Sequence, residues 1–535
     1  MKKPTYLLTL LLFLCLSSFV YRYRSAIANY FHPVPEKVRT MLAATEAHRD
    51  ELQKVIEHYQ NPEDSLKLKA AYFLLENMAY HGTVEVIWNN TRANFDMLAY
   101  EDRKGMRQAR DSLESLYGSV QPVTHFSNDL TSLSSEFLIR NIDGAFQAWQ
   151  QPWAAHVTFE QFCEFILPYR CKTEPPTLHW RQKMFEQYRW LGDSLKVPED
   201  PVEACTQINE KLKSWFSFNS LFYEYPARLS LEKLLEQQRG NCEDMSTMAM
   251  YAMRAMGIPI GSDFVPYWGR WNSGHNWNVV LAKDNTFLPF MGTEASPEYS
   301  QADEPKHSYM GYKGLAKVYR STFQFNANSL AHIKTAEETI PPFLNSGTFT
   351  DVTAEYTQTY DLTLRLEENP TPESRFVYLC VFNSGTWKAV HWSPIEQDGR
   401  TRFSEMGANI IYRPMFYNGT YSPAGPPFHL LPDGRMTSLE PSSDSTVSLR
   451  ADRWGPWLSG ADDSNAVHPG KDYELFYWKN NQWESLGRQK ATSSEIAFAN
   501  APRNGYFRLQ CDGDPTGRIF IIHKVEGEQT HMIWH

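Results

Sequence analysis

The sequence has few cysteines, no excess of basic residues and no metal-ligand motif, and each shortage removes a class of function. Its 535 residues include seven cysteines, none in a C-x-x-C pair, and 16 scattered histidines without an H-E-x-x-H motif. Because zinc sites need such spaced ligands, the sequence predicts no metal and no cofactor. The formal net charge is -10. Since nucleic-acid binding requires a basic surface, we expect no nucleic-acid partner.

Long apolar runs are also scarce, and the only one stands at the N-terminus. It covers Tyr6–Val20, follows Met1-Lys2-Lys3 and precedes two arginines and Ala26-Ile27-Ala28. A basic start, a short apolar segment and an Ala-x-Ala site predict a signal peptide or membrane anchor over 1–28. The run is short for a membrane span, which needs about 20 residues. An uncleaved anchor and lipid attachment at Cys15 remain alternatives. We expect an exported protein that is periplasmic, extracellular or part of the cell envelope.

The length predicts several domains, because a single hydrophobic core stops growing near roughly 250 to 300 residues. Residues 36–220 show helical patterns. Asn61-Pro62-Glu63-Asp64 is typical of a helix start, and Thr158-Phe159-Glu160-Gln161 is typical of a capping box. Further helices are expected around 101–117, 131–150, 178–195 and 203–218. We therefore predict a helical N-terminal domain over 36–220.

From about residue 350 onward, apolar and polar residues alternate between turn residues, which is typical of antiparallel sheet. Two segments there resemble each other. Each has an aromatic strand, a turn and a tryptophan, followed by a strand, a loop and a phenylalanine; they are Val377–Phe382 with Trp387 and Phe403, and Tyr473–Trp478 with Trp483 and Phe498. We infer two antiparallel β-sandwich modules, 345–440 and 441–535, divided near Pro441–Asp444. Chance recurrence of such patterns in β proteins is the alternative.

The stretch most informative for chemistry is Gly240-Asn241-Cys242-Glu243-Asp244. Gly240 permits a tight turn, Asn241 is a typical cap residue, and an apolar stripe follows at helical spacing until Gly257; its members are Met245, Met248, Ala249, Ala252, Met253 and Met256. Cys242 is then expected in the first turn, facing inward. The helix dipole and unpaired amides favour its thiolate, while Glu243 and Asp244 oppose it, so a cationic partner is needed.

A candidate partner lies further along the chain in Ser273-Gly274-His275-Asn276-Trp277. Strand alternation puts His275, Trp277, Val279 and Leu281 on one face, which is expected to pack against the methionine stripe. A cysteine at a helix start that faces a histidine on a strand supplies a nucleophile together with a general base or acid. We therefore predict Cys242 as the nucleophile and His275 as its base. The alternative for Cys242 is a buried structural cysteine.

These two motifs carry a family resemblance. Gly-Asn-Cys-Glu-Asp opening a helix that ends in Gly257-Ile258-Pro259, followed by Gly274–Val280 in a strand, resembles the catalytic core of the transglutaminase-like superfamily. The resemblance covers about residues 225–300. It implies a papain-like α+β core, placed at 221–335, in which Cys, His and a carboxylate act in that chain order. Flanking segments such as Asp64–Ala71 and Phe165–Arg170 also resemble exported bacterial proteins that carry this domain.

The third catalytic residue departs from the family pattern. The resemblance implies an aspartate on the strand that follows the histidine strand, in a Trp-x-Pro-x-Asp motif, and here Phe287–Met291 puts Met291 at that position. Glu294 and Asp284 are nearby carboxylates. We predict Glu294, because a loop leaving the strand end can fold back to His275, whereas Asp284 lies in the turn at the opposite end. Loss of the orienting acid would lower the rate more than abolish the reaction.

Other residues are candidates for binding substrate. The Cys242 amide and the Gln238 side chain are candidate donors to an oxyanion, although an upstream glutamine is more often part of a solvated helix face. Trp268 and Trp271, in the loop before His275, are candidates to line a substrate groove. In a chain with 16 tryptophans, packing is an equally good interpretation.

Together these features predict an exported thiol acyl-transfer enzyme, a cysteine peptidase or amidase that cleaves peptide or isopeptide amides through a thioester. The expected partner is then a peptide or protein substrate, with cell-envelope material as one candidate. We expect contact with the membrane only through the N-terminus. An amine acceptor would instead make the protein a transglutaminase. Met291 at the acid position favours a third hypothesis, a catalytically weak or inactive binding protein of the envelope.

Overall fold

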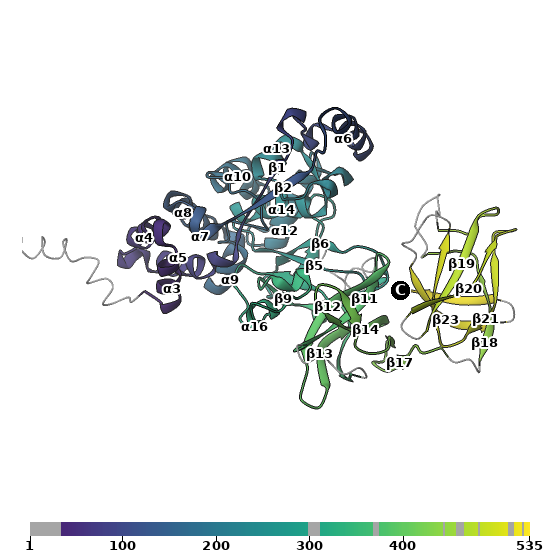
Figure 1. Ribbon diagram of the computed structural model, residues 1–535. Helices are drawn as coiled ribbons and strands as arrows, with labels where there is room; N and C mark the ends of the chain where they lie inside the picture. The colour runs from purple at the N-terminus through teal and green to yellow at the C-terminus, as the bar shows by residue number, and fades with distance from the viewer. Residues whose placement is uncertain are drawn as a thin grey trace, which may run out of the picture. The chain divides into compact units, whose positions relative to one another are not determined.

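The computed structural model describes residues 34–297, 311–366, 374–441, 445–455, 465–479, 482–511, 518–526 and 529–535. The expected signal peptide at 1–28, with Cys15, lies outside these ranges, as does most of the expected module boundary near Pro441–Asp444. No helix within them is long and apolar enough to cross a bilayer. The chain forms two compact units, and Figure 1 labels their helices and strands along the chain. Unit 1 comprises residues 1–262, 277–298 and 322–325, and unit 2 comprises 263–276, 299–321 and 326–535.

Unit 1 is mostly helical, as the sequence predicts. Its described α-helices are α3 (Glu36–Ala44), α4 (Arg49–His58), α5 (Ser65–Asn77), α6 (Arg103–Tyr117), α7 (Asp129–Ser132), α8 (Ser135–Trp149), α9 (Phe159–Phe165), α10 (Trp180–Tyr188), α11 (Leu191–Ser194), α12 (Pro201–Lys213), α13 (Leu231–Gln237) and α14 (Cys242–Ala255). The expected capping box is present, because Thr158 and Gln161 bond reciprocally at the start of α9. The sequence did not predict the antiparallel pair β1 (Gly82–Trp88) and β2 (Pro122–Asn128) that interrupts the helices.

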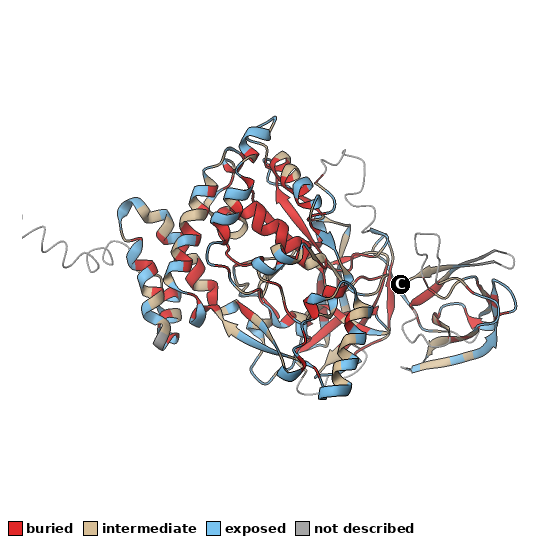
Figure 2. Cartoon of the chain, turned by 90° about the horizontal axis from the view of Figure 1, so that it is seen from above, coloured by how far each residue is buried: buried red, intermediate tan, exposed pale blue. Residues whose placement is uncertain are grey.

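Helix α14 lies inside unit 1. Every residue from Asp244 to Ala255 is buried, so the helix is covered all round and not only along its methionine stripe. It packs against α8, α10, α12 and α13. Figure 2 shows buried residues gathered in the interior of the helical part and exposed ones on its outer helices. A helix that is buried on all sides needs neighbours on all sides, and helices far apart in the sequence surround this one.

Buried charges fix the segments around α14. Arg170 bonds the Asp129 carboxylate through Nε at 2.8 Å and through Nη2, and both side chains are almost fully buried. Tyr169 donates to the same carboxylate at 3.0 Å. On α14 itself, Arg254 donates to the Arg170 carbonyl oxygen at 2.8 Å, and Tyr251 donates to Glu174 at 3.0 Å. Because removing one partner leaves a buried charge unpaired, such contacts favour a single packing of the helix.

A five-stranded sheet of order β7-β6-β5-β8-β9 contains the predicted histidine strand. The strands are β5 (Ile260–Val265), β6 (His275–Leu281), β7 (Phe287–Phe290), β8 (Tyr319–Ser321) and β9 (Phe349–Asp351). Within it, β6 and β7 are antiparallel, with Val279 opposite Pro289. Asp263 on β5 is opposite Arg320 on β8 and accepts two bonds of 2.8 Å from its guanidinium. This bidentate pair fixes the register of β5 against β8.

The C-terminal part of unit 2 is antiparallel sheet, which confirms the strand pattern expected after residue 350. One group contains β10 (Thr359–Arg365) paired with β13 (Arg400–Gly407), and a sheet of β11 (Phe376–Asn383), β12 (Thr386–Pro394), β14 (Ile410–Tyr417), β15 (Tyr421–Pro423), β16 (Phe428–Leu430) and β17 (Met436–Ser438). The second group contains β18 (Thr446–Ala451) paired with β21 (Ile496–Pro502), and a sheet of β19 (Asp472–Lys479), β20 (Gln482–Lys490), β22 (Tyr506–Cys511), β23 (Ile519–Glu526) and β24 (Gln529–Trp534).

The two groups repeat one strand order. The five strands β10 to β14 correspond in order to the five strands β18 to β22. In each set, the first strand pairs with the fourth, the second and third form a hairpin, and the fifth pairs with the second. Both hairpins carry a register shift, at Leu379/Cys380 and at Leu475/Phe476. Phe403 and Phe498 are buried in separate apolar cores. The similarity between the two sequence segments therefore corresponds to a repeated topology.

Candidate active site

The start of helix α14 is built by Gly240, Asn241 and Asp244. The Asn241 side chain accepts bonds from the amides of Glu243 at 3.0 Å and Asp244 at 3.2 Å, and Asp244 accepts the Asn241 amide at 3.0 Å. The expected cap is thus confirmed as a reciprocal capping box. Gly240 is required, because a Cβ there would lie 2.3 Å from the Asp244 Cβ. Burial raises the pKa of the Asp244 carboxyl to about 6. This geometry holds Cys242 at the first position of the helix.

The sulfur of Cys242 lies beside the hydroxyl of Tyr223. The cysteine is half-buried, and the Tyr223 Oη to Cys242 Sγ distance is 3.6 Å. Burial and the negative charges of Cys242 and Glu243 raise the pKa of Tyr223. The phenol therefore stays protonated, and its O–H group donates a hydrogen bond to the sulfur. A hydrogen bond to the charged form of a group favours that form. Tyr223 is therefore a donor to a thiolate, and it was missed because no spacing in the sequence connects it to Cys242.

Glu243 does not leave an uncompensated charge next to the nucleophile. Its carboxylate forms an ion pair with the Arg228 guanidinium, and both side chains are partly exposed. From the sequence alone, Glu243 and Asp244 are expected to oppose the thiolate. The positive charge of Arg228 offsets the negative charge of Glu243. The Asp244 carboxylate accepts a hydrogen bond from the Asn241 amide at the helix cap. A partly exposed ion pair is worth at most about 1 kcal/mol, so its role here is local neutralisation more than stability.

His275 is the first residue of β6 and belongs to unit 2, whereas Cys242 belongs to unit 1. The pairing of the imidazole with the sulfur therefore stays a prediction. The imidazole stacks on Trp268, with ring centroids 6.1 Å apart and ring planes at 27°. Burial and the nearby Lys313 ammonium lower the pKa of His275 to about 4. In this environment the ring is neutral at pH 7 and is a weaker base than an ordinary imidazole.

The loop that leads to His275 is held by Asn383, the last residue of β11. The buried Asn383 amide donates to the carbonyl oxygens of Trp268, Trp271 and Ser273 at 3.2, 2.8 and 3.0 Å. Its oxygen accepts the Ser273 amide at 2.9 Å. Gly274 is also constrained, because a Cβ there would lie 2.5 Å from two carbonyl oxygens. One side chain thus fixes the loop, and no sequence signal pointed to it.

The two tryptophans proposed as a substrate groove differ in exposure. Trp268 is only 2 % exposed, so it packs against its neighbours, among them the imidazole of His275. Trp271 is partly exposed, and its ring forms an edge contact with Tyr312, with centroids 6.3 Å apart. The exposed ring is the one available to a substrate.

The candidates for the orienting acid and for the oxyanion donor lie in turns. Glu294 lies in the turn closed by the Met291–Ala295 bridge, and its side chain is exposed. Asp284 lies at the other end of β7, where its carboxylate accepts bonds from the amide and hydroxyl of Thr286. Gln238 is exposed in a left-handed turn, with φ of 53° at the end of α13. The role of Glu294 as the orienting acid and of Gln238 as an oxyanion donor stay predictions.

Met291 is held by contacts within unit 1. The Asn209 side chain donates to the Met291 carbonyl oxygen at 3.2 Å and accepts the Thr293 amide at 2.7 Å. The turn packs closely against α14, because a Cβ at Gly292 would lie 2.8 Å from the Ala249 Cβ. Asn209 therefore fixes the backbone at the position where the family pattern has its aspartate.

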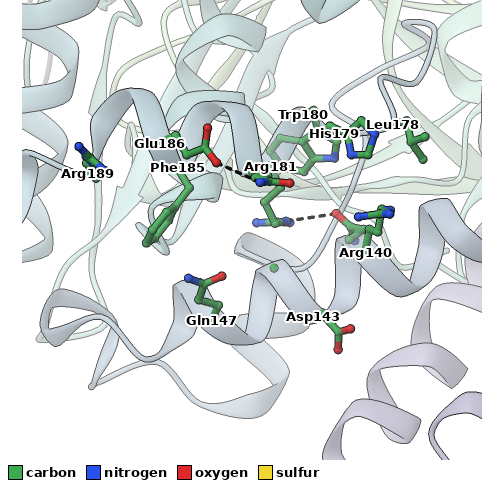
Figure 3. Close-up of a pocket in the computed structure, with 13 residues that line it drawn as sticks. Arg140, Asp143, Gln147, Leu178, His179, Trp180, Arg181, Phe185, Glu186 and Arg189 are labelled. Carbon is green, nitrogen blue, oxygen red and sulfur yellow. Dashed lines mark hydrogen bonds between the residues drawn. The ribbon is translucent and has the colours of Figure 1, made fainter.

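A pocket of about 460 Å³ lies apart from both candidate residues, between α8 and α10 (Figure 3). Arg181 lines it, and its Nε donates to Asn141 at 3.2 Å. The other guanidinium nitrogens donate to the carbonyl oxygens of Arg254 and Ile166 at 2.7 Å each. These carbonyls end α14 and α9, where a cation is favoured by the helix dipole. The buried arginine is thus explained as a helix cap and needs no bound anion.

The described residues hold no group of three or more His, Cys, Asp or Glu side chains arranged to bind a metal. The six cysteines in the described ranges, Cys163 and Cys171 among them, are not joined in disulfides. Burial raises the pKa of both these thiols to about 12. They are therefore poor nucleophiles at neutral pH.

Comparison with known proteins identifies the domain around Cys242. Residues 189–291 match the family model described as the transglutaminase-like superfamily. The chain thus carries a domain of the transglutaminase-like superfamily, which confirms the resemblance seen in the sequence. The matched range begins at Arg189, before the start of the core predicted at 221–335.

No curated protein matches the chain. Thirty-three chains of solved structures do, among them the crystal structure of red sea bream transglutaminase. That match is 9 % identical, covers 85 % of this chain and 79 % of the other, and has a TM-score of 0.22. Because that score is low, the family assignment rests on the family model.

Proposed function

We propose that this protein is an exported cysteine peptidase or amidase that acts on peptide or isopeptide amide bonds. The observation that carries the proposal is the setting of Cys242: a half-buried thiol at the first position of a buried, capped helix, with a phenolic donor 3.6 Å from its sulfur. The family match supports acyl-transfer chemistry in general. A thiolate at a helix N-terminus that receives a hydrogen bond is a nucleophile at neutral pH.

In the proposed reaction, the Cys242 thiolate attacks the amide carbon and a C–S bond forms. The C–N bond breaks as His275, which carries the proton taken from the thiol, protonates the leaving nitrogen. Water then attacks the thioester, His275 accepts its proton, a C–O bond forms and the C–S bond breaks. The Cys242 amide at the helix start is the proposed donor to the oxyanion, with Gln238 as a second candidate, and Glu294 is the proposed orienting acid.

Hydrolysis and amine transfer share the thioester and differ only in the acceptor. We favour water, because bacterial domains resembling this one are more often regarded as peptidases. A lysine side chain as acceptor would make the protein a cross-linking transglutaminase. The substrate in either case is a peptide or protein, and cell-envelope material is the proposed source. The two C-terminal groups of strands are proposed as β-sandwich modules.

A binding protein without catalysis is the second candidate. Met291 favours it, because this residue occupies the family's acid position and Asn209 and α14 hold its backbone in place. In that case the domain would bind peptide or glycan without cleaving it. The thiol of Cys242 would then react no faster than an ordinary thiol.

Alkylation kinetics of Cys242 discriminate between the two candidates. We expect iodoacetamide at pH 7 to modify Cys242 at least about tenfold faster than the half-buried Cys511 of the same molecule, measured by peptide mapping, because a stabilised thiolate is the reactive species. The faster alkylation of Cys242 should disappear in His275→Ala. It should persist in His125→Ala, which replaces an exposed histidine. Equal rates at the two cysteines would exclude the enzyme and favour the binding protein.

A further inference from the structure

Lys313 occupies an aromatic surround next to His275. Its Nζ lies 5.5 Å from the ring centroid of Trp268, 5.8 Å from Trp271 and 5.7 Å from Tyr312. Two backbone bonds hold the lysine segment against the loop that precedes His275, from the Arg270 amide to the Lys313 carbonyl oxygen and from the Gly269 amide to the Gly314 carbonyl oxygen, both 2.8 Å. The ammonium is therefore positioned by the same loop that positions the imidazole.

This ammonium has no carboxylate partner in the part of the chain that the structure describes. Neither Lys313 nor Arg270 takes part in an ion pair there, although lysines and arginines elsewhere in the protein do. Lys313 is half-buried, and burial lowers its pKa. A cation–π contact is worth about 0.5 to 2 kcal/mol, but a ring accepts hydrogen bonds poorly and leaves the ammonium donors for another acceptor.

The positive charge of Lys313 also acts on the candidate base. The Lys313 ammonium and burial both lower the pKa of His275. An imidazolium, which the proposed mechanism requires, is therefore disfavoured before the substrate binds. An anion that paired with Lys313 would remove part of this repulsion, because it would offset the positive charge that lowers the pKa of the ring. A cation that hinders the base is disadvantageous unless the substrate supplies the compensating charge.

We propose that Lys313, with Trp271 and Tyr312 beside it, recognises a carboxylate carried by the substrate close to the scissile amide. The substrate class is then an acidic peptide or isopeptide. This inference rests on the proposed function, since it places the carboxylate at the site where His275 acts with Cys242. Trp271 and Tyr312 are partly to largely exposed, so an entering substrate can reach the ammonium between them.

A matched pair of alkylating reagents tests the inference without knowledge of the natural substrate. Iodoacetate and iodoacetamide deliver nearly the same group to a thiol, but only the first carries a carboxylate. We expect the iodoacetate to iodoacetamide rate ratio at Cys242 to fall about three- to tenfold in Lys313→Gln, because one positive charge is lost near the site. The ratio should be unchanged in Lys313→Arg, which keeps the charge. The wild-type ratio should also fall with rising salt.

The exposed Lys471 of unit 2 provides the control, because Lys471→Gln removes the same charge away from His275. The iodoacetamide rate in each variant reports whether the fold and the nucleophile are intact. An iodoacetate to iodoacetamide ratio in Lys313→Gln equal to that of the wild type would overturn the inference while leaving the enzyme in place. If neither reagent modifies Cys242 faster than Cys511, the proposed function fails, and the inference fails with it.

Discussion

The hydroxyl of Tyr223 lies 3.6 Å from the sulfur of Cys242, and this contact joins two segments that the sequence does not connect. Tyr223 belongs to the short helical segment Ser220–Glu224, and Asn241 bonds the carbonyl oxygen of the adjacent Phe222 at 3.1 Å. The cap residue of α14 therefore also places the donor beside the nucleophile.

Replacing Tyr223 by phenylalanine should slow the alkylation of Cys242 at pH 7. The phenol stabilises the thiolate by donating a hydrogen bond, and bonds to charged groups are worth roughly 1.5 to 3 kcal/mol, of which a partly exposed group keeps a fraction. We expect about a three- to tenfold slower rate and an upward shift of the pH midpoint of alkylation. Stopped-flow measurement between pH 5 and 9 checks both. An unchanged profile would show that the hydroxyl does not act on the sulfur.

The cap residue Asn241 should support both stability and reactivity. Asn241→Ala removes the acceptor for two helix amides, so we expect a loss of about 1 to 2 kcal/mol in the free energy of unfolding. The alkylation rate of Cys242 should fall as well. Ser230, which caps α13, is the matched control. Ser230→Ala should lower stability in urea denaturation and leave the alkylation rate unaltered; a similar fall in rate for both variants would mean that the effect is general.

Asn383 should control the position of His275 from a different segment of the chain. Asn383→Ala removes the side-chain donor to three carbonyl oxygens and the acceptor for the Ser273 amide, and the loss of a typical hydrogen bond costs about 1 kcal/mol. We expect Asn383→Ala to lower the free energy of unfolding. The alkylation rate of Cys242 should then be the same in Asn383→Ala and in the double variant Asn383→Ala/His275→Ala. Asn418→Ala, in the exposed turn before β15, serves as the control. Additive effects of Asn383→Ala and His275→Ala on alkylation would argue against this role.

The third catalytic residue can be tested by two carboxylate substitutions. If Glu294 orients His275, Glu294→Gln should lower the alkylation rate of Cys242 by about tenfold, because the imidazolium loses its counter-charge. Asp284→Asn should have no effect, since the Asp284 carboxylate is engaged with Thr286. The reverse result would assign the role to Asp284, and no effect of either would favour a dyad without an acid.

Stability should fall as the pH drops from about 6.5 to 4, because buried histidines must become protonated on unfolding. Burial lowers the pKa of His81 to about 4, and its Nε2 lies 2.8 Å from the carbonyl oxygen of Phe323. Above pH 6.5 the ring is neutral in both states and its contribution is complete. Between pH 6.5 and 4 only the unfolded state binds the proton, so unfolding is favoured by at most about 3 kcal/mol.

The histidine contribution can be isolated by substitution. His81→Gln should reduce the difference between the unfolding free energies at pH 7.5 and pH 4.5, whereas His125→Gln, at an exposed position on β2, should not. Urea denaturation at the two pH values measures this. Equal pH dependence in wild type and His81→Gln would show that other groups cause the acid loss.

The sequence by itself determined the features that depend on neighbours along the chain. The Asn241 cap, the helix from Cys242 to Ala255 ended by Gly257, the Thr158 capping box and the β6 strand all follow from local propensity and hydrophobic period, and the structure contains them. The family resemblance was visible for the same reason, because its motifs are short and contiguous. The similarity of the two C-terminal groups was also visible, since aromatic strands and turns recur in both, whereas the order in which their strands pair was not.

The tertiary structure alone decided which distant residues surround these motifs. Tyr223 at the sulfur, Asn383 around the His275 loop and Lys313 among three aromatic rings have no local sequence signal, because side chains meet through packing and not through spacing. The same reason explains why α14 is buried on every side when its sequence showed one stripe, and why Trp268 packs inside while Trp271 reaches the surface. Contacts between segments depend on the whole core, which no window of residues contains.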